Sequence, residues 1–259
     1  MITVTDAQIR AIPGWFGRID VAAFRVLLPQ TGSHLSGGHL AELGVYHGKS
    51  AVLLGSYLQP GETLTVIDLF GADGEDAANT RENREHYPEL TRSQFEGRYR
   101  GIYGELPVVV QDVSSAITEH ASRGSHRFVH IDASHLYEQV VKDIAAARML
   151  LKPDGVVVID DYRTEHAPGV AAAAWQATST GLHPFLLTPM KMYATWGDAE
   201  PWRQAIDSWA EHSGDGYERQ MIGDDEVIRV WSKPPKIVRL IPSAARPAVS
   251  RLRALLQNR

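Results

Sequence analysis

Short apolar runs alternate with longer amphipathic stretches along the chain. Apolar residues recur every three or four positions from Leu136 to Leu151, which predicts a helix with one buried face, and Lys142, Asp143 and Arg148 lie mostly off that face. The apolar runs are short enough to be buried strands, and the first five lie at residues 39–43, 63–67, 107–111, 127–131 and 155–159. Beyond residue 180, HPFLLTP, KMYATW and EVIRVWSK predict further strands and PWRQAIDSWAEHS predicts a helix. This alternation is typical of a mostly parallel sheet with helices on both faces.

The same pattern divides the chain into a central α/β domain with appendages. Residues 1–36 predict one or two helices, broken at Pro13 and Pro29, that pack on the main domain or cover its cleft. Residues 37–232 form the domain, and the polar stretch at about 71–105 is too long for a simple connection, which predicts an insert after the second strand. Residues 233–259 have no acidic side chain and carry Arg and Lys among apolar positions, which fits a basic tail or an amphipathic helix.

Composition narrows the class of protein. The 259 residues include 26 Lys plus Arg against 31 Asp plus Glu, a formal charge of −5 that gives no basic field for nucleic acid. There is no cysteine, no signal-peptide pattern at the start and no apolar run of the roughly 20 residues that a bilayer requires. We expect a cytoplasmic protein without stable membrane insertion, which binds a small-molecule or saccharide substrate, and the insert and tail make a homodimer plausible.

A glycine turn follows the first predicted strand, in the segment HLAELGVYHGKS. Gly44 and Gly48 allow the backbone to turn tightly and approach a ligand, and the helix that follows begins with free N–H groups. The dinucleotide fingerprint needs a glycine where this chain has Tyr46, which argues against NAD. Asp68 ends the second strand, where a carboxylate can accept both hydrogen bonds of a ribose diol; capping a helix is its alternative role.

Two later strands each end in acidic residues. Asp132 follows FVHI, and Asp160 and Asp161 follow VVVI. If the two strands are parallel neighbours, their carboxyl ends meet at one edge of the sheet and three carboxylates converge. Such a cluster raises its own pKa values unless a cation binds, and oxygen ligands without cysteine favour Mg²⁺, then Ca²⁺ or Mn²⁺.

These segments together resemble the class I S-adenosylmethionine-dependent O-methyltransferases that use a metal, of the catechol and caffeoyl-CoA type. DASHLYE and LKPDGVVVIDDY are more similar still to bacterial macrocin-type and methylmannose-polysaccharide enzymes that methylate sugars, over roughly residues 37–165. The resemblance implies a Rossmann-like, seven-stranded, mostly parallel sheet and S-adenosylmethionine as cofactor. It also places Asp132, Asp160 and Asp161 at the three metal-ligand positions.

The resemblance assigns further roles residue by residue. It implies cofactor contacts from the motif AELGVYHGKS, which contains Glu42, Gly44, Tyr46, Gly48 and Ser50, with Glu42 at the methionine end, although Glu42 could be an ordinary turn acid. It places Asp112 and Ser114 near adenine, while Asp112 could equally cap a helix.

His135 stands where the catechol-type enzymes have a lysine that takes the substrate proton. Histidine accepts a proton near neutral pH, so His135 is the candidate base; its alternative role is a locally bonded residue at the start of a helix. His130, two residues before Asp132, is expected in the core.

The sequence therefore predicts methyl transfer to a substrate oxygen, with a metal holding a sugar diol or, alternatively, a catechol-like phenol. Two other enzyme classes stay open. An NAD-dependent oxidoreductase would share the scaffold. A non-haem-metal hydroxylase would usually have two histidines and one carboxylate as ligands, a triad that His135 with Asp132 and Asp160 could mimic.

Overall fold

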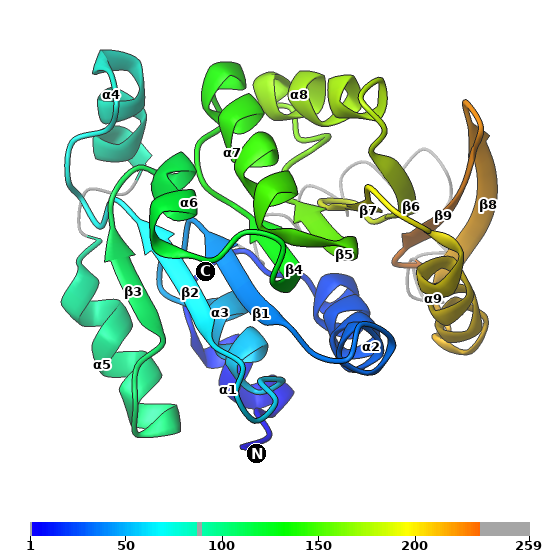
Figure 1. Ribbon diagram of the computed structural model, residues 1–259, viewed down its shortest axis with the longest axis horizontal. Coiled ribbons are helices and arrows are strands. Elements are labelled where there is room, and N and C mark those ends of the chain that lie inside the picture. Colours follow the sequence, from blue (N-terminus) through cyan, green and yellow to red (C-terminus); the bar gives the residue numbers. More distant parts are fainter. Residues whose placement is uncertain (1, 87–89, 234–259) are drawn as a thin grey trace, which may run out of the picture.

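The computed structural model describes residues 2–86 and 90–233, so the predicted basic tail at 233–259 lies almost wholly outside the described residues. The described residues form one sheet of nine strands in the order β3-β2-β1-β4-β5-β7-β6-β9-β8 (Figure 1). The strands are β1 (His39–Leu43), β2 (Leu64–Asp68), β3 (Val108–Gln111), β4 (His126–Ile131), β5 (Leu151–Ile159), β6 (His183–Leu187), β7 (Met192–Thr195), β8 (Gly216–Ile222) and β9 (Asp225–Trp231).

The first five strands are parallel, and β7 runs antiparallel between β5 and β6. The predicted fold class is confirmed, with one difference. The sheet has nine strands where seven were expected, because β9 pairs with β6 and β8 extends the sheet beyond β9.

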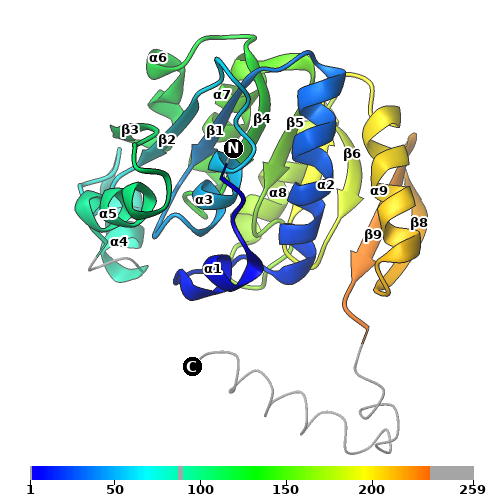
Figure 2. The ribbon, with the colours of Figure 1, turned by 90° about the horizontal axis from the view of Figure 1, so that it is seen from below.

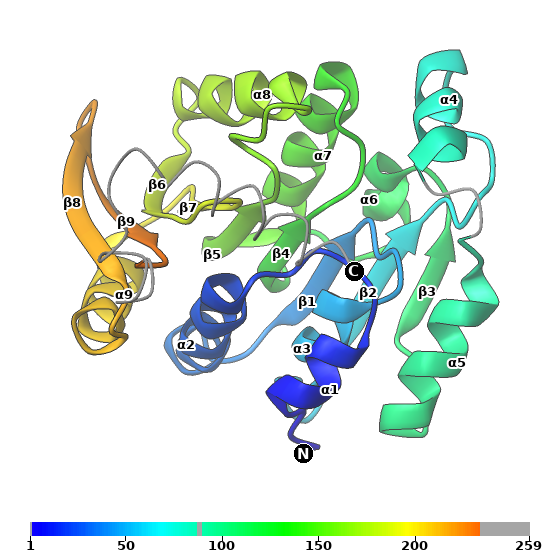
Figure 3. The ribbon, with the colours of Figure 1, turned by 180° about the vertical axis from the view of Figure 1, so that it is seen from behind.

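Helices cover both faces of the sheet (Figures 1 and 3). They are α1 (Asp6–Ala11), α2 (Arg18–His34), α3 (Lys49–Gly55), α4 (Ala77–His86), α5 (Arg92–Tyr103), α6 (Ile117–His120), α7 (Tyr137–Leu150), α8 (Pro168–Thr178) and α9 (Glu200–His212), with a 3₁₀ turn, η1, at Ser114–Ala116. Alternate strand residues build two separate cores. One lies under α2, α3 and α9, and the other under α7 and α8. Within the described ranges, no helix has the length and hydrophobicity that crossing a membrane requires.

Helix α2 is a layer of the domain as well as part of the N-terminal segment. Phe24, Leu27 and Leu28 are fully buried in the core beneath the sheet, and α2 lies along the strands in Figure 2. The guanidinium of Arg127 on β4 donates to the Leu28 carbonyl and pairs with Glu62 at 2.9 Å, so a buried cation ties the helix to the sheet. The expected covering role falls instead to residues 13–16 before α2, which line a cavity.

Helix α7 begins and ends within one residue of the predicted span, but one of its polar residues was placed wrongly. Asp143 is fully buried, whereas the periodic pattern put it mostly off the apolar face. Neither carboxylate oxygen has a hydrogen-bond partner among the residues described, and burial raises the pKa of Asp143 to about 7. The cause is η1, which packs over this side of α7 and buries a position that would otherwise face solvent.

Candidate active site

A cavity of about 360 Å³ opens at the carboxyl ends of the parallel strands, where ligands bind in open α/β sheets. Segments that are far apart in the chain form its wall. They are residues 13–16, the turn after β1, the end of β2, part of α4, and the loops after β4 and β5. The cavity therefore brings the predicted glycine turn and the predicted acidic strand ends to one place.

The turn after β1 requires glycine. Gly44 has φ +79°, and a Cβ there would lie 2.0 Å from the carbonyl oxygen of Asp132. Asp68 holds the same turn from the other side, because its carboxylate accepts the backbone N–H groups of Val45 at 2.7 Å and Tyr46 at 3.0 Å. The backbone thus bends away from the cavity floor and leaves open space above the strand ends.

The predicted cofactor residues divide into two groups. Gly44, Tyr46, Ser50, Asp68 and Ser114 line the cavity.

The other three lie behind or beside its wall. Glu42 is fully buried beneath the turn, Gly48 begins α3 and packs against Phe95, and Asp112 is exposed and accepts the N–H of Val113. Burial raises the pKa of Glu42 to about 8, and its Oε2 has no hydrogen-bond partner in the described part of the chain. A cationic group above the turn would stabilise this carboxylate, as the resemblance implies for the methionine end of the cofactor.

Asp132 and Asp160 face the same side of the sheet as Glu42, together with a buried lysine. The ammonium of Lys191 pairs with Asp160 and lies 3.9 Å from Oδ2 of Asp132. It also lies 3.0 Å from Nε2 of His130. Burial alone would lower the pKa of Lys191, but Asp160 and Asp132 raise it above its usual range, so the side chain is charged.

His130 is buried, as expected, and its protonation follows from this contact. An ammonium can only donate, so Nε2 of His130 accepts and its Nδ1–H donates to Oε1 of Glu42 at 2.7 Å. Burial and Lys191 lower the pKa of His130 well below its usual value, which keeps the ring neutral. A continuous buried network thus links Glu42, His130, Lys191 and Asp160.

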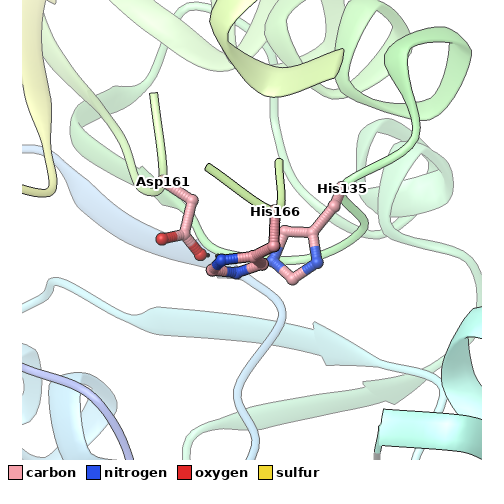
Figure 4. Close-up of side chains that lie close together, drawn as sticks. All are labelled: His135, Asp161 and His166. Atoms are coloured by element: carbon pink, nitrogen blue, oxygen red, sulfur yellow. Dashed lines mark hydrogen bonds and ion pairs between the residues drawn. The ribbon is translucent and has the colours of Figure 1, made fainter. Parts of the chain in front are cut away.

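Asp161 points away from this network. Its φ is +55°, and its Oδ2 lies 3.2 Å from Nε2 of His135. Figure 4 shows the Asp161 carboxylate directed at the imidazoles of His135 and His166, whose ring centroids are 5.3 Å apart. The two acids that are adjacent in sequence therefore serve different partners.

Glu82 of the insert holds His135 in place. One carboxylate oxygen accepts the backbone N–H of His135 at 2.6 Å, and the other accepts the hydroxyl of Ser134 at 2.5 Å. Hydrogen bonds to Asp161 and Glu82 raise the pKa of His135 to about 10, so the imidazole holds its proton at neutral pH in this arrangement.

The residues do not fit the expected magnesium site of three aspartates. Among the residues described, the potential ligand atoms that lie within 4.8 Å of one another form two groups, His130–Asp132–Asp160 and His135–Asp161–His166. The first group already contacts the Lys191 ammonium, and the second has two nitrogen donors, which magnesium does not prefer. Of the three aspartates expected around one ion, Asp132 and Asp160 thus lie together, whereas strand alternation and the positive φ of Asp161 direct the third carboxylate to His135.

Comparison with known proteins gives a family match that includes the glycine turn and the acidic strand ends lining this cavity. Residues 41–162 match a family model described as a methyltransferase domain. A search of curated proteins by sequence finds no match.

Solved structures share the fold. The O-methyltransferase NovP superposes with a TM-score of 0.56 at 15% identity, over 69% of this chain and 81% of NovP. A protein from Corynebacterium glutamicum superposes with a TM-score of 0.51 at 16% identity, over 76% of this chain and 92% of that protein.

The matched domain and the shared fold agree with the enzyme expected from the sequence, an S-adenosylmethionine-dependent O-methyltransferase.

Sequence reasoning missed two residues of the site, Glu82 and Lys191. Glu82 lies in a polar helix of the insert with no signal that distinguishes it from Glu85. Lys191 is the first residue of the predicted strand KMYATW, but its role depends on β7 lying beside β5, a pairing that the sequence alone does not reveal.

Proposed function

We propose that the chain transfers the methyl group of S-adenosylmethionine to a hydroxyl oxygen of a sugar. The observation that carries the proposal is that the glycine turn after β1 and the Asp161–His135 pair line the same cavity. The matched methyltransferase domain covers both of these elements.

The cofactor would lie along the glycine turn. When bound, it supplies an electrophilic methyl group on a sulfonium, and the electron pair of the S–CH₃ bond stays on sulfur when the methyl group is transferred. Gly44 and Tyr46 would contact it through the turn, Asp68 through the free electron pairs of its carboxylate, and Ser114 through its hydroxyl. The buried Glu42 beneath the turn would balance a positive charge at that end.

The acceptor hydroxyl would bind at Asp161. Asp161 lines the cavity beside His135, so its carboxylate can accept the hydroxyl hydrogen. The bond orients an oxygen lone pair toward the methyl carbon. As the O–CH₃ bond forms, the hydroxyl proton passes to the carboxylate of Asp161, because the His135 imidazole already holds its proton, and Glu82 keeps that imidazole oriented. This reaction has no metal step, because the three aspartates do not form one ligand set.

The cavity mouth supports a sugar acceptor. The exposed Trp15 stacks on Tyr46, with ring centroids 5.5 Å apart, and presents a flat apolar surface of the kind that packs on a sugar ring. Asn79, Asn83 and Ser134 add polar groups to the same wall. A catechol-like phenol is the alternative acceptor.

A screen with isotopically labelled S-adenosylmethionine tests the proposal. Sugars and glycosides should accept label, and the His135→Ala variant should lower turnover about 10²–10⁴-fold. Label transfer to catechols but not to any sugar would overturn the proposed acceptor, and unchanged turnover in the variant would remove His135 from the reaction.

A further inference from the structure

The sheet register brings Lys191 to Asp160. In the antiparallel pair of β5 and β7, Ile159 lies opposite Met192. The next residue out on β5 is Asp160, and the residue before Met192 is Lys191, so the two are cross-strand neighbours at the cavity edge. Because side chains alternate along a strand, both point to the face that α2 covers.

Hydrogen bonds within the turn before β7 also fix the backbone of Lys191. The backbone N–H of Lys191 donates to Oγ1 of Thr188 at 2.9 Å, and the Thr188 hydroxyl donates to Asp20 of α2 at 2.7 Å. The Tyr193 hydroxyl donates to the same oxygen of Asp20 at 2.8 Å. The turn between β6 and β7 is thus fixed by a buried acid, and the lysine side chain is only 1% exposed.

The ammonium occupies the space that a divalent ion would need. Magnesium binds carboxylate oxygens at about 2.0–2.1 Å and attracts them by its charge. Here Asp160 already bonds to a cation, Asp132 lies 3.9 Å from it, and His130 turns its lone pair to the ammonium. An added ion would meet a fixed positive charge about 4 Å away in a poorly solvated site.

We propose that Lys191 replaces the divalent cation at Asp132 and Asp160, so that methyl transfer by this chain requires no metal. The claim about methyl transfer rests on the proposed function, whereas the claim about ion binding does not. Lys191 is a positioning residue: it neutralises the carboxylate pair and keeps Asp132 at the cavity wall, and it does not line the cavity itself.

Binding of Mn²⁺ to the chelator-treated full chain tests the replacement, with free Mn²⁺ followed by electron paramagnetic resonance and neither cofactor nor acceptor present. The wild type should bind no stoichiometric ion at the carboxylates. Lys191→Met, which keeps the length of the side chain and removes the charge, should bind one ion at least about tenfold more tightly than the wild type. When Asp160→Asn is added to that variant, the gain in affinity for Mn²⁺ should disappear.

Lys152→Met is the matched control. Lys152 is partly buried and donates to the carbonyls of Leu35 and Gly37, away from the carboxylates, so this variant should gain no ion. A wild type that binds one Mn²⁺ at micromolar concentrations, and loses it on Asp160→Asn, would overturn the proposal even if Lys191→Met does not fold.

Methyl transfer gives a separate measurement. Turnover of the wild type should be unchanged by EDTA, and an EDTA-sensitive rate restored by Mg²⁺ would also overturn the proposal. Absence of any transfer would count against the proposed function only, since the Mn²⁺ measurement stands without it.

Discussion

Glu82 shows how one residue of the insert can control the chemistry of a distant loop. Its two carboxylate oxygens bond to Ser134 and to the backbone of His135, and it is the one acid of α4 that lines the cavity, as far as the chain is described. Without these bonds the imidazole would lose its orientation toward Asp161.

We expect Glu82→Gln to lower kcat by roughly 10–100-fold, the range typical for partners that orient a reactive group. Steady-state kinetics with the accepted sugar would measure it. Glu85→Gln, an exposed acid on the same helix, is the control and should leave kcat unchanged. Equal effects of both variants would mean that the charge of the helix matters and not the bonds of Glu82.

Asp143 gives a prediction for pH. Its pKa is raised by burial from 3.8 to about 7 in the folded state, so the folded chain holds a proton that the unfolded chain has lost. Its contribution to the free energy of unfolding is therefore full below pH 3.8 and is lost as pH rises toward 7. The amide of the Asp143→Asn variant does not titrate, so the variant does not lose free energy of unfolding in this way as pH rises.

The variant should gain stability relative to the wild type between pH 5 and pH 8, by up to about 4 kcal/mol at pH 8 if three pKa units are recovered. Urea unfolding at both pH values measures the difference, with the exposed Asp112→Asn as control. A difference between Asp143→Asn and wild type that is the same at both pH values would contradict the assigned cause.

At the scale of elements, α2 takes one of the two roles expected for residues 1–36. Residues 1–36 were predicted to pack on the domain or cover its cleft, and α2 proves to be one of the helices that close the core. Phe24 is fully buried and makes edge contacts with Phe128 on β4, with ring centroids 5.0 Å apart.

Phe24→Ala should therefore destabilise the whole domain by about 3–5 kcal/mol, the usual cost of removing a buried phenylalanine. Chemical denaturation should show one cooperative transition at lower denaturant, with Phe24→Leu between the variant and the wild type. A separate early transition, with the main one unchanged, would show that α2 is an independent cap.

The sequence predicted the positions of the helices and strands better than it predicted which strands pair with one another. The first five strands were found because each coincides with a short apolar run, as is typical of strands in a parallel sheet. Strand β8, GYERQMI, was missed because it is an outer strand with few apolar positions, and the order of β6, β7 and β9 depends on pairings between segments far apart in the chain.

The same distinction applies to the site. The glycine turn, Asp68 and the acidic strand ends lie in the cavity because local sequence and strand direction determine them. That Asp160 faces Lys191 while Asp161 faces His135 depends on the alternation of side chains and on a backbone turn with positive φ, neither of which a motif encodes.

At the scale of the whole molecule, the cavity is assembled from the N-terminal segment, the insert and the strand ends, so a bound cofactor should stabilise all three. At one hundred times its Kd, S-adenosylhomocysteine should add about 2.7 kcal/mol to the free energy of unfolding and raise Tm by roughly 5–10 °C. Thermal unfolding with and without ligand measures this. NAD⁺ at the same concentration is the control, and a shift with NAD⁺ alone would indicate the oxidoreductase class.

The bond between Asp20 and Thr188 joins residues 168 positions apart. During synthesis the first long helix emerges early, whereas the turn that its buried acid must anchor leaves the ribosome only after most of the domain. Until then Asp20 lacks these partners, and the nascent chain has no completed active site. We expect ribosome-bound chains that stop before residue 188 to be sensitive to protease within residues 18–34, and chains that expose residue 233 to be protected there.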